Sequence, residues 1–254
     1  MKRLICTAVI TGMATILCSC ASAPIRPPEY STKDIISLPT APILRKDIIH
    51  TVAPGETVWR IAKMYDIETK DIMRANTLKR PKELKMGRRL LIPDAAPLKA
   101  VIPLYPSKKW KYIIIHHSAT DEGSALHFHI AHHLRGFKRG LGYHFVIDNG
   151  TRGKEDGHIE VSPRWLKQLD GAHCKASGMN KKGIGICLVG NFNKERISKK
   201  QMDSLLYLVN CLRKHYKIPL KNIMGHNQVF GARTECPGKN FPLSEFKKQL
   251  KVFN

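Results

Sequence analysis

An apolar run that ends in two histidines constrains the fold of this 254-residue chain most strongly. Residues 112–117 read Tyr-Ile-Ile-Ile-His-His, and the small polar residues Ser118 and Thr120 follow. A short isoleucine-rich run bounded by polar residues is typical of a buried β-strand. Because side chains alternate between the two faces of a strand, His116 and His117 are expected on opposite faces. The run therefore predicts a strand that holds one histidine at its end.

Patterns downstream of this strand predict an α/β domain over residues 109–254. Two further apolar segments, residues 143–148 and 183–192, have the composition of strands. Residues 198–217 predict an amphipathic helix, because apolar residues recur along one helical face. These apolar residues are Met202, Leu205, Leu206, Leu208, Val209 and Leu212. Residues 243–253 predict a C-terminal helix.

The first residues of the chain predict export. Lys2 and Arg3 precede an apolar stretch, residues 4–17, which is too short to span a bilayer comfortably and has the length of a signal peptide. The stretch ends in Leu-Cys-Ser-Cys and resembles a bacterial lipoprotein signal. That resemblance implies removal of residues 1–19 and attachment of lipid to Cys20. An ordinary signal peptide with chance cysteines is the alternative. No other segment is apolar enough to cross a membrane, so the remainder is expected to be soluble and tethered.

The charge of the chain indicates attraction to a polyanion. The sequence has 43 Lys and Arg against 20 Asp and Glu, a formal charge of +23. In an exported protein no nucleic acid is expected as a partner, and anionic cell-wall polymers or membrane surfaces fit the charge better. A generic solvated surface is the alternative.

The cysteines do not form the dense framework of a small disulfide-stapled domain. Of the seven, Cys6 and Cys18 leave with the signal and Cys20 is the lipidation site. The remaining four have no short repeating spacing; they are Cys174, Cys187, Cys211 and Cys236. Cys187 and Cys211 lie in apolar segments and are expected to be small buried core residues.

Two proline-bearing segments divide the chain. Residues 20–47 predict an extended tether and residues 95–108 a linker. Between them, residues 48–94 predict a strand, a Pro-Gly turn, a helix that Thr57 caps, a second helix that starts at Thr69, and a closing strand.

This small βααβ segment resembles a LysM domain. The motifs that carry the resemblance are V-x-P-G-E-T-V-W-x-I-A at 52–62, R-A-N-x-L at 74–78 and M-G-R-x-L-x-I-P at 86–93. The resemblance implies binding of N-acetylglucosamine-containing glycans in a groove between two loops. The first loop joins the first strand to the first helix (Pro54, Gly55, Glu56, Thr57), and the second follows the second helix (Asn76, Thr77, Leu78). Turn formation and helix capping alone are the alternative roles for these residues.

Two arrangements of histidines suggest a metal site. If residues 127–133 are helical, His129 and His133 lie one turn apart, as in the H-E-x-x-H zinc motif, but Ile130 stands where that motif has its catalytic Glu. The second arrangement is dispersed and comprises His116, His226 and Cys236. Two imidazoles and a thiolate are a sound catalytic zinc set, because they leave the fourth tetrahedral position for water. Their spacings in the sequence, 110 and 10 residues, do not alone establish that these three residues form a metal site.

Residues 110–245 resemble the zinc-dependent amidase domain shared by phage lysozyme-type amidases, bacterial N-acetylmuramoyl-L-alanine amidases and peptidoglycan-recognition proteins. The motifs are IIIHHSAT, GLGYHFVIDNG, GAHCKASGMNKKGIGICLVGNF and GHNQVFGARTECPGKNFP, in the order of the family. The resemblance implies a mixed central sheet flanked by helices, and Zn²⁺ bound by His116, His226 and Cys236. It further implies catalytic roles for Tyr143 and Thr234, and a substrate contact for His173.

The implied activity is hydrolysis, by a zinc-activated water, of the amide between N-acetylmuramic acid and the L-alanine of the peptidoglycan stem peptide. Tyr143 would help to stabilise the oxyanion; a core aromatic residue is its alternative role. Alternative functions are a non-catalytic peptidoglycan-binding tether or sensor, and a stem-peptide endopeptidase. A nucleophilic pair of His173 and Cys174 is a further alternative. Because no aspartate follows Cys20, the lipid anchor is expected in the outer membrane of a diderm bacterium, facing the periplasm.

Overall fold

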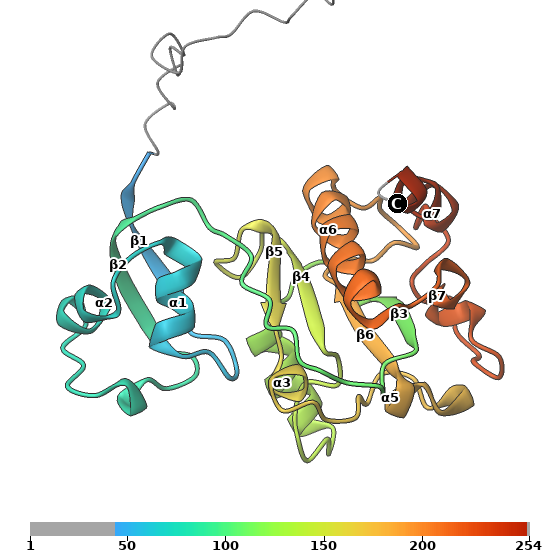
Figure 1. Cartoon of the computed structure of the whole chain (residues 1–254), viewed down its shortest axis with the longest axis horizontal. Coiled ribbons are helices and arrows are strands. Elements are labelled where there is room, and N and C mark those ends of the chain that lie inside the picture. The colour runs from blue at the N-terminus through green and yellow to red at the C-terminus, as the bar shows by residue number, and fades with distance from the viewer. Residues whose placement is uncertain (1–43, 253–254) are drawn as a thin grey trace, which may run out of the picture. The chain divides into compact units, whose positions relative to one another are not determined.

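The computed structural model describes residues 44–252 of the chain (Figure 1). The predicted signal peptide at 1–19, the lipidation at Cys20 and most of the tether at 20–47 lie outside these residues. Within the described part, no helix combines the length and the apolar character needed to cross a bilayer.

The N-terminal module has the predicted strand-helix-helix-strand order. Its elements are β1 (Lys46–Thr51), α1 (Val58–Tyr65), α2 (Thr69–Ala75), the short 3₁₀ turn Pro81–Glu83 and β2 (Arg89–Ala95), with β1 and β2 antiparallel. The Thr57 side chain accepts a hydrogen bond from the Arg60 amide and caps α1, as predicted. The apolar faces of both helices pack on the two strands, with Ile61 and Ile72 fully buried.

The second module is built on one mixed sheet. Its strands are β3 (Tyr112–His117), β4 (Phe145–Asn149), β5 (Asp156–Val161), β6 (Gly183–Leu188) and β7 (Ile223–Gly225), in the order β5-β4-β6-β3-β7. Four of them run parallel, and β5 is antiparallel to β4. This confirms the predicted α/β class with a mixed central sheet.

Helices cover both faces of this sheet. They are α3 (Ala125–Leu134), α4 (Pro163–Leu166), α5 (Met179–Lys182), α6 (Lys199–Tyr216) and α7 (Leu243–Val252). Helix α6 lies across β4 and β5 and packs on α7 (Figure 1). Its apolar stripe joins the core cluster that contains Ile113 and Ile115. Ile114 belongs to a separate cluster with Met179 of α5, because alternate residues of β3 point to opposite faces.

Local signals explain where α6 begins. Ser198 and Gln201 form a reciprocal capping box at its N-terminus, which satisfies two backbone amides that have no helical partner.

Cys187 in β6 is fully buried, as predicted for a core residue. Cys211 on α6 is only partly buried, because it lies beside the apolar stripe rather than within it.

Candidate metal centre

The ends of two adjacent strands place two of the predicted ligands side by side. In the parallel pair β3-β7, Ile115 is opposite Gly225, so His116 and His226 are the next residues at the same edge of the sheet. His116 is 1% exposed, and the centroids of the two imidazole rings are 4.6 Å apart. A separation of 110 residues in sequence is therefore closed by parallel strand pairing.

A loop after β7 returns Cys236 to this edge. The Asn227 amide donates to the Cys236 carbonyl at 2.7 Å, and the Cys236 amide donates to Thr234 Oγ1 at 3.1 Å. Gly238 has φ +103°, and a Cβ there would lie 2.5 Å from the Phe192 carbonyl carbon, so only glycine fits this close approach. These constraints hold Cys236 Sγ 3.6 Å from His116 Nδ1.

His116, His226 and Cys236 form what we call the metal triad, and their geometry fits Zn²⁺. One ligand atom from each lies within 4.8 Å of the others. Tetrahedral zinc with the usual Zn–N and Zn–S bond lengths has a nitrogen–sulfur edge of about 3.6 Å, the separation that His116 Nδ1 and Cys236 Sγ show. Two imidazoles and a thiolate are also donors that zinc prefers.

The electrostatics of the metal triad leave it without positive charge of its own. Burial lowers the pKa of His116 well below its ordinary value and also lowers the pKa of His226, so both rings are neutral at neutral pH. Burial raises the pKa of the Cys236 thiol to about 12. A coordinated metal cation reverses this by deprotonating the thiol. The His117 amide, which donates to Cys236 Sγ at 3.4 Å, would then stabilise the thiolate.

Tyr143 lies beside the metal triad, just before β4. Its ring centroid is 5.2 Å from that of His116. Burial, with added effects of Cys187 and Cys236, raises the pKa of the Tyr143 phenol well above its usual range. The hydroxyl therefore remains a proton donor at any physiological pH, which suits the predicted oxyanion role.

Thr234 and His173 make contacts that their predicted roles did not include. Thr234 is exposed, and its hydroxyl oxygen accepts the amide hydrogen of Cys236. His173 is buried, with Nδ1 3.0 Å from His116 Nε2 and Nε2 3.2 Å from the Gly183 carbonyl. The catalytic role of Thr234 and the substrate contact of His173 remain predictions, and both residues contact a member of the metal triad.

His117 and His144, which lie near the metal triad, have structural partners. His117 points to the other face, where its Nδ1 accepts from the Phe192 amide at 3.1 Å. His144 Nδ1 accepts from the Gly185 amide at 2.9 Å, and its Nε2 is 3.1 Å from the Leu169 carbonyl. His129 and His133 do lie on a helix, α3, but belong to neither group of metal-compatible side chains among the described residues.

Cys174 does not form a nucleophilic pair with His173. Cys174 is 2% exposed, and its Sγ lies 3.8 Å from the Ala176 carbonyl oxygen. Burial raises the pKa of this thiol, which disfavours the reactive thiolate.

The predicted glycan-binding residues of the LysM module are largely engaged within the module. Glu56 Oε2 accepts from the Ala53 amide at 2.7 Å and lies 2.8 Å from His50 Nε2. The Asn76 side chain donates to Ile72 and Leu91 carbonyls and accepts from the Leu91 amide, which ties α2 to β2. Pro54 is buried and Gly55 is exposed with φ +82°. The side chains of Glu56, Thr57 and Asn76 therefore shape the two predicted groove loops, and their contact with glycan remains a prediction.

A second buried group of possible metal ligands was not predicted from the sequence. Asp148 of β4 and His158 and Glu160 of β5 have ligand atoms within 4.8 Å of one another. Lys154 Nζ lies among them, 3.0 Å from Glu160 Oε2, and its side chain is 4% exposed. We call these four residues the hairpin cluster. The signal that could have found it is the alternation of His158 and Glu160 with apolar residues in a short segment.

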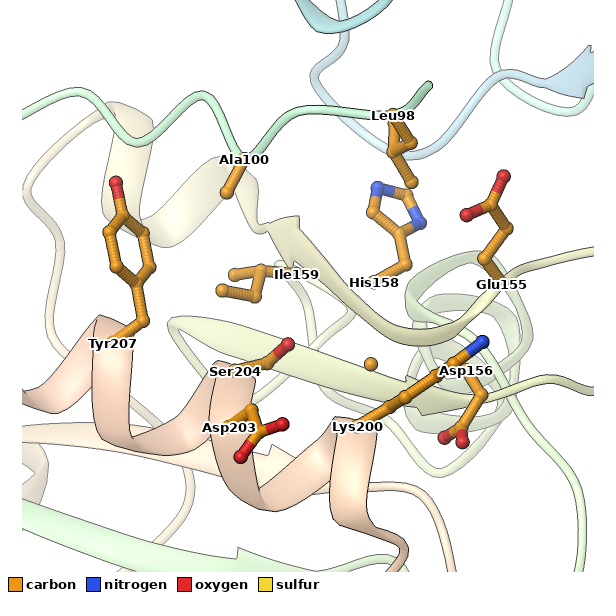
Figure 2. A pocket seen from close by; sticks show the side chains of 11 residues that line it. Leu98, Ala100, Glu155, Asp156, His158, Ile159, Lys200, Asp203, Ser204 and Tyr207 are labelled. Atoms are coloured by element: carbon orange, nitrogen blue, oxygen red, sulfur yellow. The ribbon is translucent and has the colours of Figure 1, made fainter. Parts of the chain in front are cut away.

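A cavity of about 380 Å³ lies between β5, α6 and the segment around Leu98 and Ala100 (Figure 2). Asp156, Lys200 and Tyr207 are among its lining residues, and no member of the metal triad is. Asp156 is held by the Ser198 hydroxyl at 2.8 Å, the residue that caps α6. This hydrogen bond ties Asp156 of β5 to the N-terminus of α6.

Comparisons with known proteins identify the modules. The profile of the family described as N-acetylmuramoyl-L-alanine amidase matches residues 106–239, and that of the LysM domain matches residues 50–93. Peptidoglycan-recognition protein 2 of Holotrichia diomphalia is 31% identical over 141 residues, which are 52% of this chain and 67% of that protein. A peptidoglycan recognition protein of Trichoplusia ni is 31% identical over 100 residues, which are 39% of this chain and 48% of that protein. The chain thus matches about half the length of this second relative.

Among solved structures, the chain is similar to N-acetylmuramoyl-L-alanine amidase LysC from Clostridium intestinale, with 32% sequence identity and a TM-score of 0.47. The match covers 61% of this chain and 95% of that chain. The family profile extends over more than half of the sequence. The chain therefore belongs to the N-acetylmuramoyl-L-alanine amidase family and carries a LysM domain ahead of its amidase domain.

Proposed function

We propose that this protein is a zinc-dependent hydrolase that cleaves the amide between N-acetylmuramic acid and L-alanine in peptidoglycan. The observation that carries the proposal is the convergence of His116, His226 and Cys236 at one sheet edge with zinc-compatible spacing. When bound there, Zn²⁺ would supply the Lewis acid that activates a water at neutral pH.

Each residue of the site has a separate role in the proposed reaction. His116 and His226 offer neutral imidazoles, and Cys236 offers the single negative charge. Tyr143, still protonated, donates a hydrogen bond to the oxygen of the scissile amide as negative charge develops on it. The Thr234 hydroxyl fixes the loop that presents Cys236.

The LysM domain supplies binding to the same polymer that the amidase domain cleaves. A weak glycan-binding module on the same chain raises the local concentration of substrate at the catalytic domain. The formal charge of +23 adds attraction to anionic cell-wall material. Attachment of a lipid to Cys20, in the outer membrane facing the periplasm, would confine this activity to the cell envelope.

Two measurements on the purified protein test the proposed reaction. Atomic spectroscopy is expected to find one zinc per chain, and digestion of sacculi is expected to release stem peptides with a free L-alanine N-terminus. Binding to sacculi with zinc present and no cleavage would identify a non-catalytic tether or sensor instead. Products cut within the stem peptide would identify an endopeptidase.

Anchoring is tested separately. Labelling with a radioactive fatty acid is expected for the wild-type protein and not for the variant Cys20→Ser, and membrane fractionation locates the labelled species. Labelling that persists in Cys20→Ser would contradict the assignment of Cys20.

A further inference from the structure

His173 is bonded on one side to a backbone carbonyl and on the other to a member of the metal triad. Its Nε2 is 3.2 Å from the Gly183 carbonyl oxygen, which can only accept a hydrogen bond. Nε2 of His173 must therefore carry the proton. In a neutral ring, Nδ1 of His173 then has the free lone pair.

That lone pair determines the tautomer of the next ring. His173 Nδ1 is 3.0 Å from His116 Nε2, so Nε2 of His116 must be the donor. The remaining nitrogen of His116, Nδ1, then bears a lone pair and faces Cys236 Sγ at 3.6 Å. A chain of two hydrogen bonds thus points the only free lone pair of His116 toward the other metal ligands.

The fold fixes the plane of the His173 ring. A Cβ at Gly171 would lie 2.3 Å from His173 Cδ2, and one at Gly185 would lie 2.4 Å from the same atom. The two glycines therefore form a slot that only the imidazole fills. Asn180 Oδ1 accepts from the His173 and Cys174 amides at 2.8 Å each, which fixes the backbone that enters the slot.

We propose that His173 is a positioning residue that sets the tautomer and the orientation of His116, so that Nδ1 of His116 is presented to the metal. This inference rests on the proposed zinc site. Outer partners of metal-bound histidines fix tautomer and ring orientation, and their removal commonly costs about 10–100-fold in metal affinity. Here the partner is an uncharged imidazole, which is itself oriented by a carbonyl group.

The first experiment reads the tautomers directly, without zinc. Long-range ¹H–¹⁵N NMR of the metal-free protein, with ¹⁵N-labelled histidine, distinguishes Nδ1–H from Nε2–H rings. We expect both His116 and His173 as Nε2–H tautomers. An Nδ1–H tautomer at His116 would overturn the proposal.

The second experiment measures zinc affinity by competition with a chromophoric chelator. His173→Leu removes the acceptor and is expected to weaken zinc binding about 10–100-fold, with an altered visible absorption spectrum of the Co²⁺-substituted protein. His173→Gln keeps a carbonyl oxygen to accept from His116 and an amide to donate to Gly183, and is expected to bind zinc within a few-fold of wild type.

His144→Gln is the matched control, because His144 is a neighbouring buried histidine whose two nitrogens bond only to backbone groups. It is expected to lower stability with little change in zinc affinity. Wild-type affinity in a folded His173→Leu, or equal losses in all three variants, would refute a positioning role. If the wild-type protein bound no zinc, the proposed function would fail, whereas the NMR result would still confirm or refute the tautomers.

Discussion

Two groups of possible metal ligands in the amidase domain, the metal triad and the hairpin cluster, differ in how their charge is satisfied. The hairpin cluster already contains a cation. Burial and Glu160 raise the pKa of Asp148 well above its ordinary value, which keeps this carboxyl protonated, and burial lowers the pKa of His158 to about 4. Glu160 and Lys154 then pair as opposite charges in a closed interior.

The metal triad, in contrast, has no charged side chain among its members. Its two imidazoles are neutral, and burial raises the pKa of its thiol to about 12, so the triad carries no charge of its own before a metal binds. His226 and Cys236 are only half-buried, so substrate and solvent can reach the triad. Ligand count alone therefore does not distinguish a metal centre from a structural ion cluster. The two groups differ in whether a protein cation already lies within the group and in whether one side is open to solvent.

The largest effect is expected at the metal triad. Cys236→Ser removes the soft, anionic ligand, and we expect zinc affinity and amidase activity to fall by more than the ~100-fold that loss of an outer partner costs. The measurements are zinc stoichiometry after dialysis and the rate of stem-peptide release. The control Cys211→Ser changes a thiol outside the triad and is expected to leave both quantities unchanged. An active, zinc-replete Cys236→Ser would show that the Cys236 thiolate is not a required ligand.

The next effect tests the hairpin cluster as a structural element. Lys154→Met leaves the Glu160 carboxylate buried without its cation, which is expected to lower the free energy of unfolding by about 3–5 kcal/mol. Chemical denaturation measures the loss, and zinc affinity should be unchanged. The double variant Lys154→Met, Glu160→Gln removes both charges and should recover most of the stability. A loss of zinc from Lys154→Met would instead make the two clusters one functional unit.

A smaller effect is expected at the buried pair of His50 and Glu56 in the LysM domain, where both side chains are 2% exposed. Burial alone would raise the pKa of Glu56, but the hydrogen bond and charge of His50 outweigh it and hold the value at about 2 instead of 4.5. A carboxyl whose pKa is lowered in the folded state stabilises the fold at pH values above its pKa in the unfolded chain. This stabilisation disappears as pH falls from about 4.5 to about 2.

Glu56→Gln should therefore lower stability by up to about 3 kcal/mol at neutral pH and by progressively less toward pH 2. Thermal unfolding across this pH range, followed by circular dichroism, measures the difference. Glu68→Gln, at an exposed position on the same domain, is the matched control. A difference between wild type and Glu56→Gln that did not change with pH would contradict the pKa assignment.

The smallest effect is expected from Thr234. Thr234→Val keeps the size of the side chain and removes the acceptor for the Cys236 amide, a hydrogen bond worth about 1 kcal/mol. We expect zinc affinity to fall by about fivefold or less, and Thr234→Ser to restore it. A loss of amidase activity much larger than the loss of zinc affinity would show that the hydroxyl acts on substrate as well.

Much of the fold could be predicted from local pattern. Consecutive residues are enough to predict the strand β3 from its isoleucine run, the helix α6 from its apolar stripe, and the LysM module from its motifs. Strand β5 was not among the predicted strands. His158 and Glu160 alternate with apolar residues there, but the segment is short, and the burial of these two polar side chains depends on the fold around them. Strand β7 has only three residues, too few for a periodic signal.

The site could be predicted only through family resemblance. His116, His226 and Cys236 carry little information as separate residues, and their meeting depends on which strands are neighbours. The contact of His173 with His116 could not be predicted from the sequence, because it depends on the space left by two glycines and not on any residue spacing. Side chains that serve tertiary contacts have no local signature.

The order of residues in the metal triad has a consequence for when activity can arise. His116 lies near the C-terminal end of β3, whereas His226 and Cys236 follow β7, the last strand of the sheet in sequence among the described residues. A chain synthesised or translocated only as far as residue 225 has one ligand and no centre. If the proposed zinc site is correct, the metal can bind only after the segment that follows β7 has packed against β3, and the proposed hydrolase would be inactive until then.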